Sequence, residues 1–257
     1  MKLAGDRAGW TAALALALFW GCGGGPPRPK GAAEMHPAHK MRLAESLLGA
    51  GRVSEAFVQM DQAVEADPAN PTLRLQYGQL CFRAGRYPDA EAAFFKALEL
   101  DPNLTDAHNF LGTVYHELGR HADAEREYRT ALADPAYPSP ELVYLNLGLL
   151  YGDVGREAEA IDSLRKAVGI QPKYYKAHFH LAHALERSGK LEEAAREYAV
   201  AEPGFRNSGD YYYRRGLACY RLGQLPEARE ALQRVLLIAP GSDSAAQADE
   251  LLRTIAP

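Results

Sequence analysis

The sequence predicts an all-α protein, a superhelical solenoid of six helix-turn-helix repeats closed by a C-terminal capping helix. Three observations predict this fold class. A pattern of small and apolar residues recurs at a step of 34 residues, as from Gly51 to Gly85. Each copy contains two apolar stripes of helical spacing, separated by a glycine. No stretch alternates apolar and polar residues as a half-buried β-strand does.

Three columns of the pattern hold in all six copies. A small residue precedes the turn at Ala44, Gly78, Gly112, Gly148, Ala182 and Gly216. Glycine occupies the turn at Gly51, Gly85, Gly119, Gly155, Gly189 and Gly223. Alanine begins the second stripe at Ala56, Ala90, Ala124, Ala160, Ala194 and Ala228. The step lengthens to 36 residues only between Gly119 and Gly155, which places a two-residue insertion in residues 134–140.

The column residues have simple physical roles in a helical hairpin. Apolar residues at i, i+3, i+4 and i+7 give each helix one buried face. The glycine follows the last periodic residue, where helices commonly end in a left-handed conformation. The small residues allow helices to approach closely, and prolines such as Pro102 and Pro172 separate one copy from the next. A single hairpin cannot bury its apolar face, so stacked copies must share a continuous core.

The spacing resembles that of the tetratricopeptide repeat (TPR), which is a helix, a tight turn and a second helix. The resemblance covers residues 37–242. The predicted repeats are 37–70, 71–104, 105–138, 141–174, 175–208 and 209–242. Leu251, Leu252 and Ile255 in residues 243–257 predict the helix that caps the sixth copy.

Residues 1–21 resemble a bacterial export signal. Lys2 and Arg7 precede an apolar run that is too short to span a bilayer comfortably. The pair Gly21-Cys22 resembles the end of a lipobox, in which the signal is cleaved before a cysteine that carries the lipid. Phe19 and Trp20 are bulkier than usual lipobox residues, so an ordinary secretory signal with an incidental cysteine stays open.

Residues 22–36 read as an acylated cysteine followed by a flexible Gly/Pro linker. Two or more acyl chains on Cys22 would anchor the protein stably. Gly23 after the cysteine, rather than an aspartate, resembles the signal for outer-membrane delivery. We therefore expect a lipid-anchored protein on the periplasmic face of the outer membrane.

Composition and motifs argue against several function classes. The net charge is −4 with both signs intermixed, so the basic stripe of a nucleic-acid-binding protein is missing. No phosphate-binding loop and no nucleophile motif is present, so we expect neither an enzyme nor a cofactor or small-molecule substrate. Cys81 and Cys219 hold equivalent positions four copies apart, too far for a disulfide, and read as small buried residues.

The histidines around His180 raise the question of a metal site. His180 and His183 lie one helical turn apart, as metal ligands often do. However, no acidic or thiol partner lies at a ligand spacing, and His178 occupies a packing position of the repeat. We therefore predict no metal site.

The remaining candidate is a protein-binding groove on the first helix of each copy. Positions four, seven, eight and eleven are assigned to stacking, which leaves positions two, five, nine and twelve on another face. The resemblance to TPR proteins implies that this face lines the concave groove. The predicted groove consists of Leu75, Phe82, Leu142, Leu145, Leu149, Phe179, Tyr213, Leu217 and Tyr220. Such a groove suits the apolar face of a partner helix. The alternative is that neighbouring helices cover these side chains.

A lipidation signal, a short linker and six TPR copies resemble the PilF/PilW/Tgl family of outer-membrane lipoproteins, the pilotins of type IV pili. The richness in Ala, Gly and Arg favours myxobacterial Tgl within that family. The resemblance implies binding of secretin subunits, their multimerisation and their placement in the outer membrane. An envelope scaffold that docks peptidoglycan enzymes or outer-membrane assembly components is a second reading, and a soluble co-chaperone or regulator a third.

Overall fold

The computed structural model describes residues 35–255, and in this range the chain is entirely helical. The predicted signal peptide, residues 1–21, and nearly all of the linker lie outside the described residues. The helices are α1 (Pro37–Gly49), α2 (Val53–Ala66), α3 (Pro71–Arg83), α4 (Tyr87–Leu100), α5 (Thr105–Glu117), α6 (His121–Leu132), α7 (Pro140–Asp153), α8 (Glu157–Ile170), α9 (Tyr175–Arg187), α10 (Leu191–Phe205), α11 (Gly209–Arg221), α12 (Leu225–Ile238) and α13 (Asp243–Thr254).

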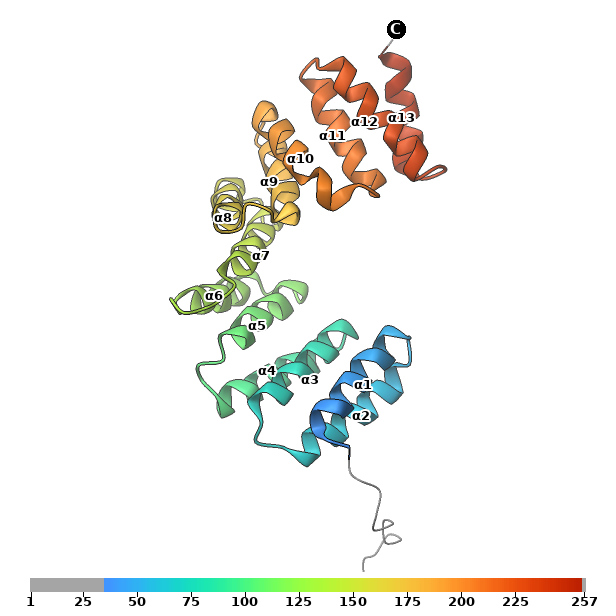
Figure 1. Ribbon diagram of the computed structural model, residues 1–257. Helices are drawn as coiled ribbons and strands as arrows, with labels where there is room; N and C mark the ends of the chain where they lie inside the picture. Colours follow the sequence, from blue (N-terminus) through green and yellow to red (C-terminus); the bar gives the residue numbers. More distant parts are fainter. Residues whose placement is uncertain (1–34, 256–257) are drawn as a thin grey trace, which may run out of the picture. The chain divides into compact units, whose positions relative to one another are not determined.

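Consecutive helices pair into hairpins, α1 with α2 through α11 with α12 (Figure 1). Each second helix also packs against the first helix of the following hairpin. First helices of adjacent hairpins contact one another directly, as α5 contacts α7 and α7 contacts α9. The last helix, α13, packs against α12 and α11. The predicted fold class, a TPR solenoid of six repeats with a capping helix, is confirmed.

The turn inside each hairpin depends on the predicted glycine. Gly119 has a φ of 71°, in the left-handed region that only glycine adopts without strain. The backbone N–H of Arg120 then donates to the carbonyl oxygen of Tyr115 at 2.8 Å, which closes the end of α5. The equivalent glycines of the other five hairpins have φ values between 71° and 75°.

The small residue before the turn sets the distance between the two helices of a hairpin. A Cβ atom placed on Gly148 of α7 would lie 2.5 Å from Cγ of Leu164 on α8. In the preceding hairpin, a Cβ atom on Gly112 would lie 2.5 Å from the ring of Tyr128. The large side chain of the second helix therefore fills the space that the glycine leaves.

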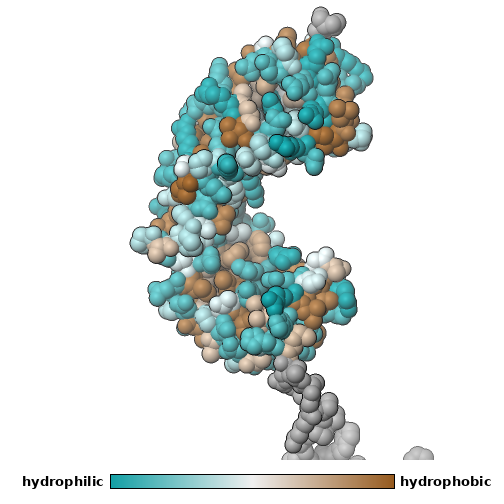
Figure 2. Space-filling view, viewed as in Figure 1, coloured by the Kyte–Doolittle hydropathy of each residue, from teal (hydrophilic) through white to brown (hydrophobic). Residues whose placement is uncertain are grey.

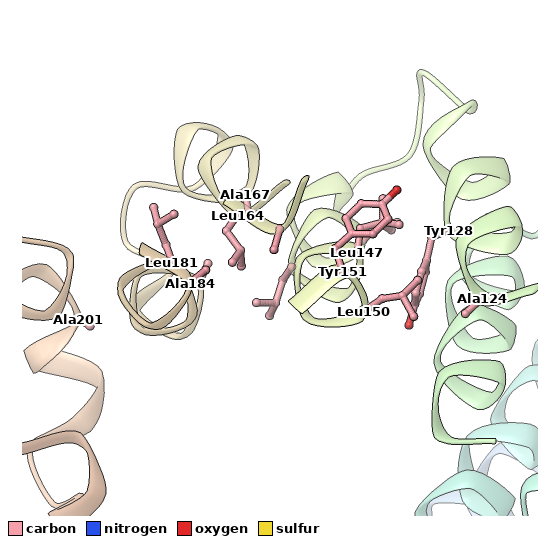
Figure 3. Close-up of a cluster of buried hydrophobic side chains, with 14 of the residues drawn as sticks. Ala124, Tyr128, Leu147, Leu150, Tyr151, Leu164, Ala167, Leu181, Ala184 and Ala201 are labelled. Carbon is pink, nitrogen blue, oxygen red and sulfur yellow. The ribbon is translucent and has the colours of Figure 1, made fainter. Parts of the chain in front are cut away.

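The core is continuous from one hairpin to the next. Leu147, Leu150 and Tyr151 of α7 lie toward Tyr128 of α6, and Leu164 of α8 lies between α7 and α9 (Figure 3). All of these side chains are buried. Because adjacent hairpins share their core, a substitution that destabilises one hairpin also destabilises the next.

Arginines at the start of the second helices link adjacent hairpins at the surface. Arg156 pairs with Glu159 of its own α8 and, at 2.7 Å, with Glu125 of the preceding α6. Its guanidinium also lies 4.3 Å from the ring centre of Tyr151. Arg120 repeats the arrangement one hairpin earlier, with Asp123 and Glu91.

The two-residue insertion folds back onto its own repeat. Tyr137 is buried, and its hydroxyl donates to Oδ1 of Asp106 at 2.9 Å. The hydroxyl of Thr105 donates to Oδ2 of Asp134 at 2.6 Å. The insertion is therefore held against α5, the first helix of the same repeat.

Between residues 35 and 255, none of the helices has both the length and the apolar composition needed to cross a membrane.

Candidate protein-binding site

The predicted groove is wrong at Leu75 and Leu145, which hold the fifth position of copies two and four. Leu75 is 7% exposed and Leu145 is 2% exposed, so neither side chain lies on an open surface. The reason is the direct contact between first helices of neighbouring hairpins. Asn109 holds this position in α5 and is also buried, and Asn146 of α7 donates to its Oδ1 at 3.0 Å. The fifth position therefore packs between repeats in copies two to four, whereas Phe179 and Tyr213 are half-buried at this position in copies five and six.

The other predicted groove residues remain at least partly accessible. Leu142 is 38% exposed, and the remaining six are half-buried, namely Phe82, Leu149, Phe179, Tyr213, Leu217 and Tyr220. Phe179 packs on Phe205 and Tyr211 at ring-centre distances of 4.8 and 6.2 Å. On the face seen in Figure 2, hydrophobic side chains form small groups separated by hydrophilic ones. No continuous apolar band joins the repeats there, and the role of these side chains in binding stays a prediction.

Two of the predicted residues, Leu149 and Phe179, line one pocket. The pocket has a volume of about 280 Å³ and lies between α7, α9 and the start of α11, with the N-terminus of α8 on one side. Its lining consists of Gly148, Leu149, Gly152, Asp153, Glu157, Leu164, Phe179, His180, His183, Ala184, Arg187, Asp210 and Arg214. The floor is apolar and the wall carries charges of both signs.

Ion pairs hold the charged wall in place. Arg187 at the end of α9 pairs with Oε1 of Glu157 at the start of α8. Arg214 pairs with Asp210 one turn earlier on α11, at 3.1 Å. Oε2 of Glu157 is itself buried and has no hydrogen-bond partner among the described residues. A buried carboxylate oxygen without a donor is costly.

The two histidines of the pocket are held in the neutral form at pH 7. Burial lowers the pKa of His180 to about 4, and the charge of Lys176 adds to the effect. The pKa of His183 is also lowered, first by burial and then by the charge of Arg214. His178 points elsewhere: its Nδ1 lies 2.6 Å from Oε2 of Glu197. Within residues 35–255, no group of three His, Cys, Asp or Glu side chains is placed to hold a metal ion.

Cys81 and Cys219 are buried free thiols, as the sequence predicts. Burial raises the pKa of Cys81 to about 12 and raises that of Cys219. Neither thiol is therefore suited to nucleophilic chemistry at neutral pH.

Comparison with known proteins identifies the repeat. The tetratricopeptide repeat family profile matches residues 47–103, 84–138 and 153–215, and a second profile of the same description matches residues 209–242. The chain belongs to the tetratricopeptide repeat family. Among curated proteins, this TPR chain is 34% identical over 61 residues to the small glutamine-rich tetratricopeptide repeat-containing protein 2 of Mycosarcoma maydis. The match covers 24% of the chain and 17% of that relative.

Two solved TPR structures match over nearly their whole length. PilW, described as a widely conserved type IV pilus biogenesis factor, superimposes with a TM-score of 0.73 at 22% identity, covering 82% of this chain and 97% of PilW. PilF of Pseudomonas aeruginosa superimposes with a TM-score of 0.72 at 19% identity, covering 84% of this chain and 97% of PilF. At these identities the likeness is one of fold, and the expected nearness to Tgl stays a prediction.

Sequence reasoning missed most of the pocket. Gly152, Glu157 and Arg187 lie on three different helices and belong to no common motif. One signal was available in the comparison of the copies. At the first residue of the second helix, copy four carries Glu157, where the other copies carry Val53, Tyr87, His121, Leu191 and Leu225.

Proposed function

We propose that the protein is an outer-membrane TPR lipoprotein that binds secretin subunits during type IV pilus assembly and promotes their multimerisation. The observation that carries the proposal is the near-complete coverage of PilW and PilF by this chain. The match covers 97% of the length of each of the two proteins, and 82% and 84% of this chain.

The N-terminal sequence supports the same proposal. A short apolar run ending at Gly21-Cys22, followed by a Gly/Pro linker, suits export and lipidation. A TPR solenoid anchored in this way presents a protein-binding surface beside the membrane into which its partner inserts. Its action on the partner is non-covalent. The net charge of −4 and the absence of catalytic motifs in the sequence agree with a binding role.

We place the partner on the surface formed by the first helices of copies four to six. Leu149 and Phe179 supply apolar contact there, and Leu142 extends it along α7. Each of them gains burial when a partner covers it, at about 25 cal/mol per Å² of apolar surface. Leu145 is excluded from this role because it is already buried.

The proposal is tested in the source bacterium by deleting the gene and measuring detergent-resistant secretin multimers on immunoblots. We expect the multimers to be lost, and to return with the wild-type gene but not with Cys22→Ala. Labelling with radioactive palmitate should depend on Cys22. Normal secretin multimers in the deletion strain, together with cell-wall or porin defects, would refute the pilus role and favour an envelope scaffold.

A further inference from the structure

The pocket between α7, α9 and α11 exists because one repeat lacks a side chain. Gly152 is the twelfth residue of copy four. The same position carries a larger residue in every other copy, namely Leu48, Phe82, His116, Glu186 and Tyr220. A Cβ atom on Gly152 would meet only Nη1 of Arg187, at 4.0 Å. No backbone or packing contact therefore requires glycine here, and its effect is to leave space.

The polar atoms of the pocket define what fits this space. Glu157 uses Oε1 to bind Arg187, whereas its buried Oε2 lacks a donor. Three carboxylates, those of Asp153, Glu157 and Asp210, face two guanidiniums. With His180 and His183 neutral, the wall carries one surplus negative charge at pH 7. A positively charged occupant is therefore favoured over a negatively charged one.

The floor defines the rest of the occupant. Leu149 and Phe179 offer apolar contact beside the carboxylates. A side chain with a methylene stem and a cationic end matches both parts, because its stem packs on apolar surface while its head reaches a carboxylate. Glu157 and Asp210 already pair with arginines, so they leave no open carboxylate face for the two bonds of an arginine fork, and the compact ammonium of lysine fits better.

We propose that this pocket is a socket for one lysine side chain of the partner protein, with its stem on Leu149 and Phe179 and its ammonium facing the carboxylates of the pocket wall. The inference rests on the proposed function only in that the lysine belongs to the protein bound on this surface. It adds a chemical requirement that the TPR fold does not impose.

The socket is tested with three blocked tripeptides that differ in one side chain, acetyl-Gly-Lys-Gly-amide and its norleucine and glutamate counterparts. Each is titrated into the full chain labelled with ¹³C in the leucine methyl groups, and the shift of the Leu149 signal is followed. We expect saturable millimolar binding of the lysine peptide, about tenfold weaker binding of the norleucine peptide, and none of the glutamate peptide. Equal binding of the lysine and norleucine peptides would overturn the proposal.

Two variants and a control locate the binding. Gly152→Tyr places in copy four the residue that copy six carries at this position, and we expect it to abolish the shift. Glu157→Gln replaces one carboxylate oxygen by an amide donor and should weaken lysine binding about tenfold. Gly169→Tyr is the matched control, because Gly169 of α8 is exposed with no atom within 4 Å of an added Cβ. Unchanged binding in Gly152→Tyr would also overturn the proposal.

The two proposals fail separately. If the chain binds the lysine peptide but the deletion strain has normal secretin multimers, the socket is supported and the pilus role is refuted. If the secretin crosslinks equally to the wild type and to Gly152→Tyr, the pilus role stands and the partner's lysine does not occupy this pocket.

Discussion

Replacing Leu145 by alanine is expected to destabilise the protein far more than the same change at Leu149, four residues later on α7. Leu145 is 2% exposed, so the change removes fully buried methyl groups and leaves a cavity between adjacent first helices. Changes of this kind cost 2–5 kcal/mol, and we expect about 3 kcal/mol. Leu149 is half-buried at the pocket, and its replacement forfeits about 1 kcal/mol.

The measurement is the free energy of unfolding from urea denaturation, followed by circular dichroism. Because repeat arrays can unfold in parts, hydrogen exchange of the α7 amide groups is measured alongside. Leu145→Asp should unfold the fourth hairpin, since it buries an unpaired charge, whereas Leu149→Asp should keep the fold and lose partner binding. A difference below about 1 kcal/mol between the two alanine variants would refute the assignment of Leu145 to the core.

Three further outcomes follow from the structure. Burial holds the pKa of His180 near 4 against an ordinary 6.5, so its contribution to stability is complete above pH 6.5 and is lost as the pH falls from 6.5 to 4. Urea denaturation across this range should show a fall of up to about 3 kcal/mol that is reduced in His180→Asn. Arg156→Gln removes one link between adjacent hairpins, and a double-mutant cycle with Glu125→Gln should give a small stabilising coupling, since the pair is partly exposed. Iodoacetamide at pH 8 should modify Cys81 and Cys219 only after unfolding, as mapped by mass spectrometry, because burial raises the pKa of both thiols.

Each of these outcomes has a result that contradicts it. An unchanged pH dependence in His180→Asn would mean that another group causes the loss of stability in acid. A coupling of zero between Arg156 and Glu125 would mean that this ion pair adds no stability to the stacked hairpins. Rapid alkylation of Cys81 in the folded protein would place the thiol outside the core.

The solenoid was readable from the sequence because its causes are local and repeated. The glycine of each turn has a left-handed φ whatever surrounds it, and six copies of the requirement appear at one spacing. The helical stripes and the close approach at Gly148 were likewise visible as columns. The same local pattern recurs in six copies, so a signal that is weak in one copy becomes strong when the copies are compared.

The candidate site was only partly readable, because exposure depends on which helix lies next to a residue. The rule that positions five and nine face outward is wrong for Leu75 and Leu145, which the adjacent first helices cover, whereas Leu149 is half-buried at the pocket. The sequence pattern of one copy cannot predict the contact between first helices, because that contact depends on the distance between adjacent copies.

By itself the sequence determined the all-α fold class, the place of each turn and the burial of the two cysteines, since each follows from spacing along one helical hairpin. Tertiary structure alone decided that Gly152 opens a pocket and that Glu157 and Arg187 meet at its wall. Side chains from α7, α8, α9 and α11 come together there only after the hairpins have stacked, and stacking brings together residues that no local pattern relates.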